Sequence, residues 1–209
     1  MRTKTLLLSA VALAAGLLSS QAQSNVYSAN VVGYVNVTNA ANTYALYALP
    51  LDSGSNTLSG LFPSVPTGSQ ILIWNGAGYT GSTKTPTSWA PNPVLLPGQG
   101  FFLRSAANGT NTFVGSVATP VGGSITNTLT ANVYALVGSP IPYSDVLSGT
   151  NLNLQVPTGS QVLIWNGAGY TGSTKTPTSW APNPTIAPGQ GFFVRSTSTT
   201  NWVQTFNLQ

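Results

Sequence analysis

The chain has 209 residues, of which only 4% are charged. It contains no histidine, cysteine or glutamate, and its two acidic residues are Asp52 and Asp145. This composition argues against a hydrolytic triad, which needs a base such as imidazole, against structural zinc, which needs Cys or His, and against a glycosidase, which needs paired carboxylates. We therefore expect a protein that is not an enzyme and that uses no cofactor and no metal.

The N-terminus has the pattern of a secretory signal peptide. Arg2 and Lys4 precede an apolar segment, residues 5–18, and Ser20-Gln21-Ala22 carries small residues at the −3 and −1 positions of a cleavage site. We predict cleavage after Ala22. The alternative, a membrane anchor, is disfavoured because a membrane span needs about 20 apolar residues. We expect a secreted protein, extracellular or at the cell surface, with the periplasm as the alternative, and no membrane span after cleavage.

The remaining charges say which partners to expect. Without Arg2 and Lys4, the net charge falls from +4 to +2. A surface that follows a phosphate backbone needs clusters of Lys and Arg, so no nucleic-acid partner is expected. The absence of cysteine excludes a disulfide framework, so the core and the hydrogen-bond ladders must stabilise the fold. The expected partners are neutral ones: a polysaccharide or further copies of the same protein.

Beyond the signal peptide the chain has the pattern of an all-β protein. Short runs rich in β-branched and aromatic residues alternate with Gly- and Pro-containing turns. One short helical turn is expected at 58–63, and Asn75-Gly76 and Asn166-Gly167 mark two hairpins. The expected strands are 31–38, 44–51, 71–74, 101–104, 112–115 and 203–208.

An internal duplication organises the chain. Val65–Ser105 and Val156–Ser196 are related by an offset of 91 and differ at only five of 41 positions. Upstream the offset is 90, so each unit has about 90 residues, the size of a small domain. We predict a signal peptide at 1–22 and two tandem, homologous β-sandwich or barrel-like domains at 23–118 and 119–209. A single sandwich or barrel closed by both halves is the alternative.

Each unit carries the order Val-Pro-Thr-Gly, Trp-Asn-Gly-Ala-Gly-Tyr and Pro-Gly-Gln-Gly-Phe-Phe. This order resembles uncharacterised secreted β-module proteins of environmental Gram-negative bacteria. The resemblance covers roughly residues 33–196. It implies an exported, surface or extracellular β-protein, and it transfers no activity and no site.

Aromatic residues are the candidate ligand-binding residues. An aromatic face stacks on a sugar ring, and a neutral sugar needs no charged partner, whereas core packing is the alternative role of such residues in a small β domain. Tyr79 and Trp89 flank polar stretches and are the better candidates for an exposed site, while Trp74 follows three apolar residues and is expected to be half-buried. The full set is Trp74, Tyr79 and Trp89 with their copies Trp165, Tyr170 and Trp180.

Three further features have a functional and an ordinary interpretation. Residues 80–88 and their copy 171–179 would form either a flat threonine array, through Thr83, Thr85 and Thr87, or a solvated loop, which we favour because of Pro86. Lys84 and Lys175 are either solvated or joined to an asparagine by an isopeptide bond that Asp52 or Asp145 promotes. Residues 26–38 either add to a sheet of a neighbouring subunit or form the first strand of the first unit, which we favour.

Two functions follow. The first is an exported structural or adhesive protein of the cell surface or extracellular matrix that self-associates. The second is a bivalent carbohydrate-binding module with one site in each repeat, which would gain avidity from its two sites. The sequence leaves the oligomeric state open.

Overall fold

A computed structural model describes residues 31–207. The predicted signal peptide and residues 23–30 lie outside this range. Within this range the protein is all-β, with 48% strand and one short helix, α2 (Leu58–Leu61), at the position expected from the sequence. All pairs of strands in the described range are antiparallel. The all-β prediction is confirmed. Within residues 31–207, no helix has the length and apolar character needed to cross a membrane.

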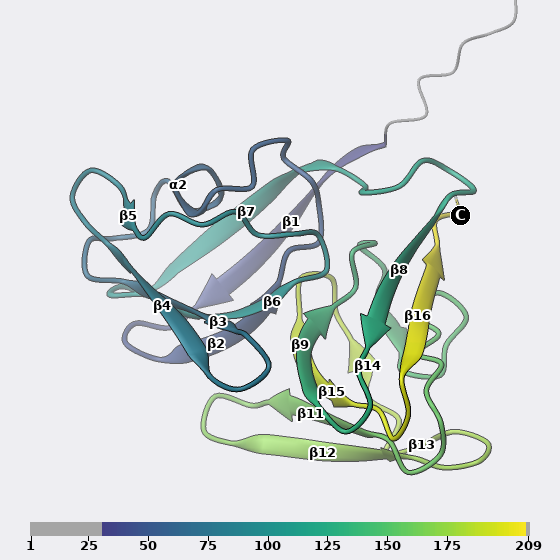
Figure 1. Cartoon of the computed structure of the whole chain (residues 1–209). Coiled ribbons are helices and arrows are strands. Elements are labelled where there is room, and N and C mark those ends of the chain that lie inside the picture. The colour runs from purple at the N-terminus through teal and green to yellow at the C-terminus, as the bar shows by residue number, and fades with distance from the viewer. Residues whose placement is uncertain (1–30, 208–209) are drawn as a thin grey trace, which may run out of the picture.

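The first half, residues 31–118, contains a five-stranded and a two-stranded sheet. The five-stranded sheet has the order β2-β6-β3-β4-β5, and β1 pairs with β7 beside it (Figure 1). These strands are β1 (Val32–Asn39), β2 (Tyr44–Ala48), β3 (Gln70–Trp74), β4 (Tyr79–Lys84), β5 (Trp89–Ala90), β6 (Gly100–Arg104) and β7 (Gly109–Ser116).

The second half repeats this arrangement. Its five-stranded sheet has the order β9-β15-β11-β12-β13, β8 pairs with β16, and a short β10-β14 pair is added. These strands are β8 (Ser124–Leu129), β9 (Tyr134–Gly138), β10 (Asp145–Val146), β11 (Gln161–Trp165), β12 (Tyr170–Lys175), β13 (Trp180–Ala181), β14 (Thr185–Ile186), β15 (Gly191–Arg195) and β16 (Thr200–Thr205).

Side-chain alternation in the central strands divides the apolar residues among three clusters. In β6, Phe101 and Leu103 point into the core of the first half, whereas Phe102 points to the opposite face of the sheet. In β15, Phe192 and Val194 point into the core of the second half, and Phe193 points away from it. The opposite faces of the two five-stranded sheets are therefore apolar as well.

These two outer faces pack against each other. Leu46, Phe102, Leu136 and Phe193 are buried there in a third cluster that draws two residues from each half. Figure 1 places the two halves next to each other, with β6 of one close to β9 of the other. Each half thus has its own core, and a third apolar layer joins them.

The predicted strands are confirmed with shifts of a few residues at their ends, and both Asn-Gly hairpins form. One expectation is wrong. Residues 80–84 are not part of a solvated loop, because they pair with β3 as strand β4, and residues 171–175 pair with β11 in the same way. Residues 32–38 pair with β7 of their own half, as we favoured. Residues 26–30 lie outside the described range.

Candidate functional site

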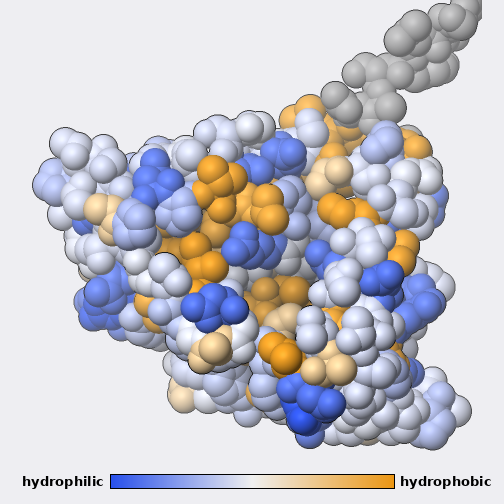
Figure 2. All heavy atoms as spheres, in the orientation of Figure 1, coloured by the Kyte–Doolittle hydropathy of each residue, from blue (hydrophilic) through white to orange (hydrophobic). Residues whose placement is uncertain are grey.

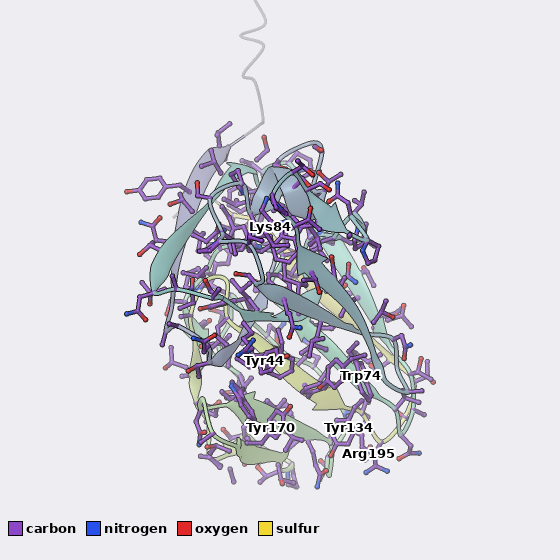
Figure 3. The ribbon with its side chains drawn as sticks, turned by 90° about the vertical axis from the view of Figure 1, so that its left-hand side faces the viewer. Tyr44, Trp74, Lys84, Tyr134, Tyr170 and Arg195 are labelled. Carbon is purple, nitrogen blue, oxygen red and sulfur yellow. The ribbon has the colours of Figure 1, made fainter. Side chains whose placement is uncertain are left out.

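Trp74 and Trp165 hold the two halves together. The Nε1–H of Trp74 donates to the carbonyl of Tyr134 at 2.7 Å, and the Nε1–H of Trp165 donates to the carbonyl of Tyr44 at 2.8 Å. Each indole also contacts a phenylalanine of the other half edge-on, with a centroid distance of 5.6 Å in both cases. Both tryptophans are half-buried, as expected for Trp74. Figure 3 shows Trp74 next to Tyr134, and Tyr44 on the other side of the same region.

Backbone hydrogen bonds between the halves are also reciprocal, since each half donates to the other. The N–H of Ala48 donates to Gly189 O at 2.9 Å, and the N–H of Gly138 donates to Gly98 O at 3.0 Å. Ala48 and Gly138 are related by the offset of 90, and Gly98 and Gly189 by the offset of 91. The interface between the halves is therefore pseudo-symmetric: one patch on each half contacts its counterpart on the other, as in an isologous dimer.

Tyr79 and Tyr170 lie at the rim of this interface, and each is 44% exposed. Each ring contacts the indole of its own hairpin edge-on, at centroid distances of 4.9 and 5.0 Å. Burial, followed by the neighbouring hydroxyl of Tyr170, raises the pKa of Tyr79. Of the six candidate aromatic residues, these two alone remain substantially exposed, and they form one pair across the interface rather than two separate sites.

Trp89 and Trp180 do not face solvent, so the expectation that Trp89 and Tyr79 form an exposed site together is wrong. Trp89 is 2% exposed and Trp180 is 4% exposed, and each belongs to the core of its half. The reason lies in segments distant in sequence. In the first half, Phe62 packs edge-on against Trp89 at a centroid distance of 6.1 Å and covers it.

The two buried indoles differ in their hydrogen bonding although their local sequences are the same. The Nε1–H of Trp89 donates to Phe62 O at 3.5 Å. The Nε1–H of Trp180 is buried and has no acceptor among the residues that the structure describes. Another buried indole of the second half, that of Trp202, does have an acceptor, because it donates to Leu152 O at 2.8 Å.

A hollow of about 400 Å³ lies beside Trp180. Lys175, at the end of β12, is the direct cross-strand partner of Trp180, and both side chains line the hollow. The other polar lining residues are Ser148, Asn153, Gln155, Thr178 and Thr200, and the apolar ones are Leu154, Val156 and Pro157. This site was not predicted from the sequence, because part of its wall, Ser148 and residues 153–155, comes from the segment that differs most between the repeats.

The outer face of β1 and β7 is the second feature that the sequence analysis missed. Tyr34 is 72% exposed, Val32 66% and Val114 57%, and Tyr34 lies directly opposite Val114. Another hollow, of about 560 Å³, opens beside them, with Val32, Val114 and residues 52–54 and 115–118 in its wall. Hydrophobic surface near the start of β1 is visible in Figure 2. The alternation of Val32 and Tyr34 with buried Val35 and Val37 was the available signal.

The charged residues stabilise turns. Asp52 accepts from Gly54 N and Asn56 Nδ2, and Asp145 accepts from the backbone N–H groups of Val146 and Asn151. These contacts do not support the isopeptide hypothesis, because the donors to both carboxylates are backbone and amide groups. Figure 3 shows Lys84 far from the aromatic interface, in the first half.

The arginines also stabilise turns. Arg104 and Arg195 donate to the backbone and side-chain oxygens of Asn42 and Asn132, which lie in the turns just before the neighbouring strands β2 and β9. The threonine array is not formed either. Thr83 lies in β4, but Thr85 closes a turn by donating to Ser88 O at 2.8 Å. These polar residues are therefore accounted for by the local structure of the hairpins and turns.

No family model matches this chain, and comparisons with curated proteins and with solved structures gave no significant similarity.

Proposed function

We propose that the chain is an exported, non-enzymatic structural or adhesive protein of the cell surface or extracellular matrix, built from a signal peptide (1–22) and two tandem domains (23–118 and 119–209), and that it acts by self-association. The observation that carries this proposal is the exposed apolar face of β1 and β7. Exposed apolar patches on proteins commonly mark interaction sites. The occupant that we propose is the same face of a second copy.

The shape of this face suits a second copy. Tyr34 projects from it, and the hollow bounded by Val32 and Val114 lies beside it. In an isologous pair, the Tyr34 ring of each copy would enter the hollow of the other. Of the six charged residues in the described range, only Asp52 borders this region, and it is engaged in its own turn. Little charge repulsion therefore opposes the pairing of two copies.

The two halves provide a precedent within the molecule. Two nearly identical sheets already associate face to face through reciprocal contacts. The alternative, a bivalent carbohydrate-binding module, has less support, because the tryptophans that it requires on the surface have other roles. Trp74 and Trp165 are used by the interface, and Trp89 and Trp180 are buried. Two equivalent aromatic platforms are not available.

The second half supplies the residues for a matched test. At the register of Tyr34 and Val114, it has the polar pair Ser124 and Thr205, whose hydroxyls are 2.8 Å apart. The double variant Tyr34→Ser/Val114→Thr therefore replaces this exposed apolar pair with the polar pair of the second half. We expect the unsubstituted protein to show a rising sedimentation coefficient with concentration, and this variant to remain monomeric with an unchanged melting temperature.

The control is Val203→Thr, which removes a 44% exposed valine from the corresponding face of the second half. It should leave association unchanged. A strictly monomeric unsubstituted protein at high concentration would refute self-association. Equal association of the double variant and the unsubstituted protein would show that another surface is responsible.

A further inference from the structure

We infer that the hollow beside Trp180 is a binding site for a carboxylated sugar, such as a uronic acid residue, and that this site exists in the second half alone. The inference does not depend on self-association, because the hollow and the β1–β7 face lie in different halves of the molecule.

The first argument is the unsatisfied donor. Trp180 is 96% buried, since only 4% of it is exposed, and its Nε1–H has no acceptor within the described part of the chain. A buried donor left without a partner destabilises the folded state. The same indole lines a hollow of about 400 Å³, within the size range of small-molecule sites. The indole nitrogen itself has almost no accessible surface, so a ligand oxygen would supply the missing acceptor after a small shift of the wall of the hollow.

The second argument is the charge of the lining. Lys175 is half-buried and is the only charged residue among those that line the hollow. A carboxylate on the ligand would pair with this ammonium group and would meet no opposing carboxylate. Ammonium–carboxylate hydrogen bonds are among the stronger ones in proteins. The charge therefore favours an acidic ligand over a neutral one.

The third argument is the polar rim. Hydroxyl groups of Ser148, Thr178 and Thr200 and amide groups of Asn153 and Gln155 surround the opening. Hydroxyls and amides both donate and accept, which is what recognition of several sugar hydroxyls requires. Leu154 and Val156 supply an apolar wall for the carbon face of a ring.

The first half provides the reason for asymmetry. Trp89 and Lys84 are paired across β4 and β5 in the same register as Trp180 and Lys175. There, however, Phe62 packs on the indole and its carbonyl accepts the indole proton. The donor that would attract a ligand is already used. Both repeats therefore contain the paired lysine and tryptophan. They differ in the segment that packs against the tryptophan, and this difference leaves room for a sugar in the second half alone.

The test uses the purified protein and proton–nitrogen NMR spectra of its indole N–H groups. Trp→Phe variants assign the signals of Trp180 and Trp89. Titration with glucuronic acid should shift the Trp180 signal progressively and leave the Trp89 signal unchanged. Glucose should bind about tenfold or more weakly, because it lacks the carboxylate that pairs with Lys175.

Two pairs of variants complete the experiment. Lys175→Gln should weaken glucuronic acid binding about tenfold or more, and its matched control Lys84→Gln should not. Trp180→Phe should weaken binding roughly fivefold, because a neutral hydrogen bond is lost, and Trp89→Phe should not. Loss of binding in the control variants to the same extent would overturn the site.

Absence of any shift with glucuronic acid would also overturn the proposal, and equal shifts with glucose would overturn its charge argument. The Tyr34→Ser/Val114→Thr variant should bind the sugar normally. A monomeric protein that binds glucuronic acid would thus contradict self-association alone, and an associating protein that does not bind it would contradict this inference alone.

Discussion

Trp89 and Trp180 occupy equivalent positions in the two copies of the repeated block and pair with equivalent lysines, Lys84 and Lys175, yet their surroundings differ. Around Trp89, Phe62 supplies a ring and a carbonyl, and the indole is fully accommodated. Around Trp180, no residue of the described range accepts from the indole N–H, the Leu152 carbonyl accepts from Trp202, and a hollow remains. In a duplicated protein, the nearly identical block conserves the sheet, while the segment that covers it decides whether a residue is core or the wall of a site.

The largest expected effect comes from removing these indoles. Trp89→Ala should lower the free energy of unfolding by about 3–5 kcal/mol. Trp180→Ala should cost about 1 kcal/mol less, because Trp180 lacks the aromatic pair and the indole hydrogen bond of its counterpart. Denaturant unfolding of both variants measures the difference. Equal losses of unfolding free energy would mean that the two environments are energetically equivalent. Losses near zero would contradict the burial of both residues.

A second comparison concerns the glycines at the interface of the halves. A Cβ at Gly100 would lie 2.7 Å from Leu136 Cγ, and one at Gly191 would collide with the Tyr47 carbonyl. Gly100→Ala and Gly191→Ala should each destabilise the protein by about 1–3 kcal/mol. The control Gly33→Ala has no atom within 4 Å of the new Cβ and should be close to neutral. Thermal unfolding of the three variants distinguishes overpacking from a general effect of replacing glycine in a strand.

The reciprocal hydrogen bonds test the symmetry of the interface. Trp74→Phe and Trp165→Phe each remove one indole donor from a carbonyl of the other half. Each should cost about 1–3 kcal/mol, since a partly buried carbonyl loses its partner, and the two costs should be nearly equal. Unequal losses in chemical denaturation would show that the pseudo-symmetry is geometric but not energetic.

The smallest change in stability at neutral pH is expected from substitution of Tyr47, whose counterpart in the second half is Val137. Burial raises the pKa of Tyr47 to about 12, and its hydroxyl donates to Thr38 O at 2.5 Å. Because the folded state holds this proton more tightly, the stabilisation is present below the unfolded pKa of 10.0 and is lost as the pH rises towards 12.

Unfolding at a series of alkaline pH values measures this loss. Tyr47→Phe should cost about 1 kcal/mol at neutral pH and should flatten the decline. A variant whose stability falls as steeply as that of the unsubstituted protein would contradict the assignment to Tyr47.

Most strands could be predicted from short runs of neighbouring residues. The surroundings of Trp89 and Trp180 could not, because they depend on contacts between segments that are distant in the sequence. Runs such as Ile71–Trp74 and the Asn75-Gly76 turn contain enough information to place β3 and its hairpin. β4 was missed because Thr, Gly and Ser give no apolar alternation, and only Ser82 of this strand is buried. Trp89 was misplaced because its polar neighbours suggest a surface loop, while the ring that covers it belongs to Phe62.

The interface between the halves could not be predicted from the sequence for the same reason. Trp74 donates to a residue 60 positions further along the chain. A repeat in the sequence shows that two units are alike, but not that their outer faces are complementary. Side-chain alternation along a strand puts Phe102 on the face opposite Phe101, yet it does not indicate what would cover that face.

The pseudo-symmetric contact between the halves should not depend on protein concentration. Two separate copies of such a sheet would associate only above their dissociation constant, but here the short connection between β7 and β8 keeps the partners at a high effective concentration. Pairing of the halves is therefore independent of how much protein is present. A protein that is released into a large volume would keep this interface closed, and only contacts between different molecules, such as the one proposed for Tyr34, would respond to its abundance.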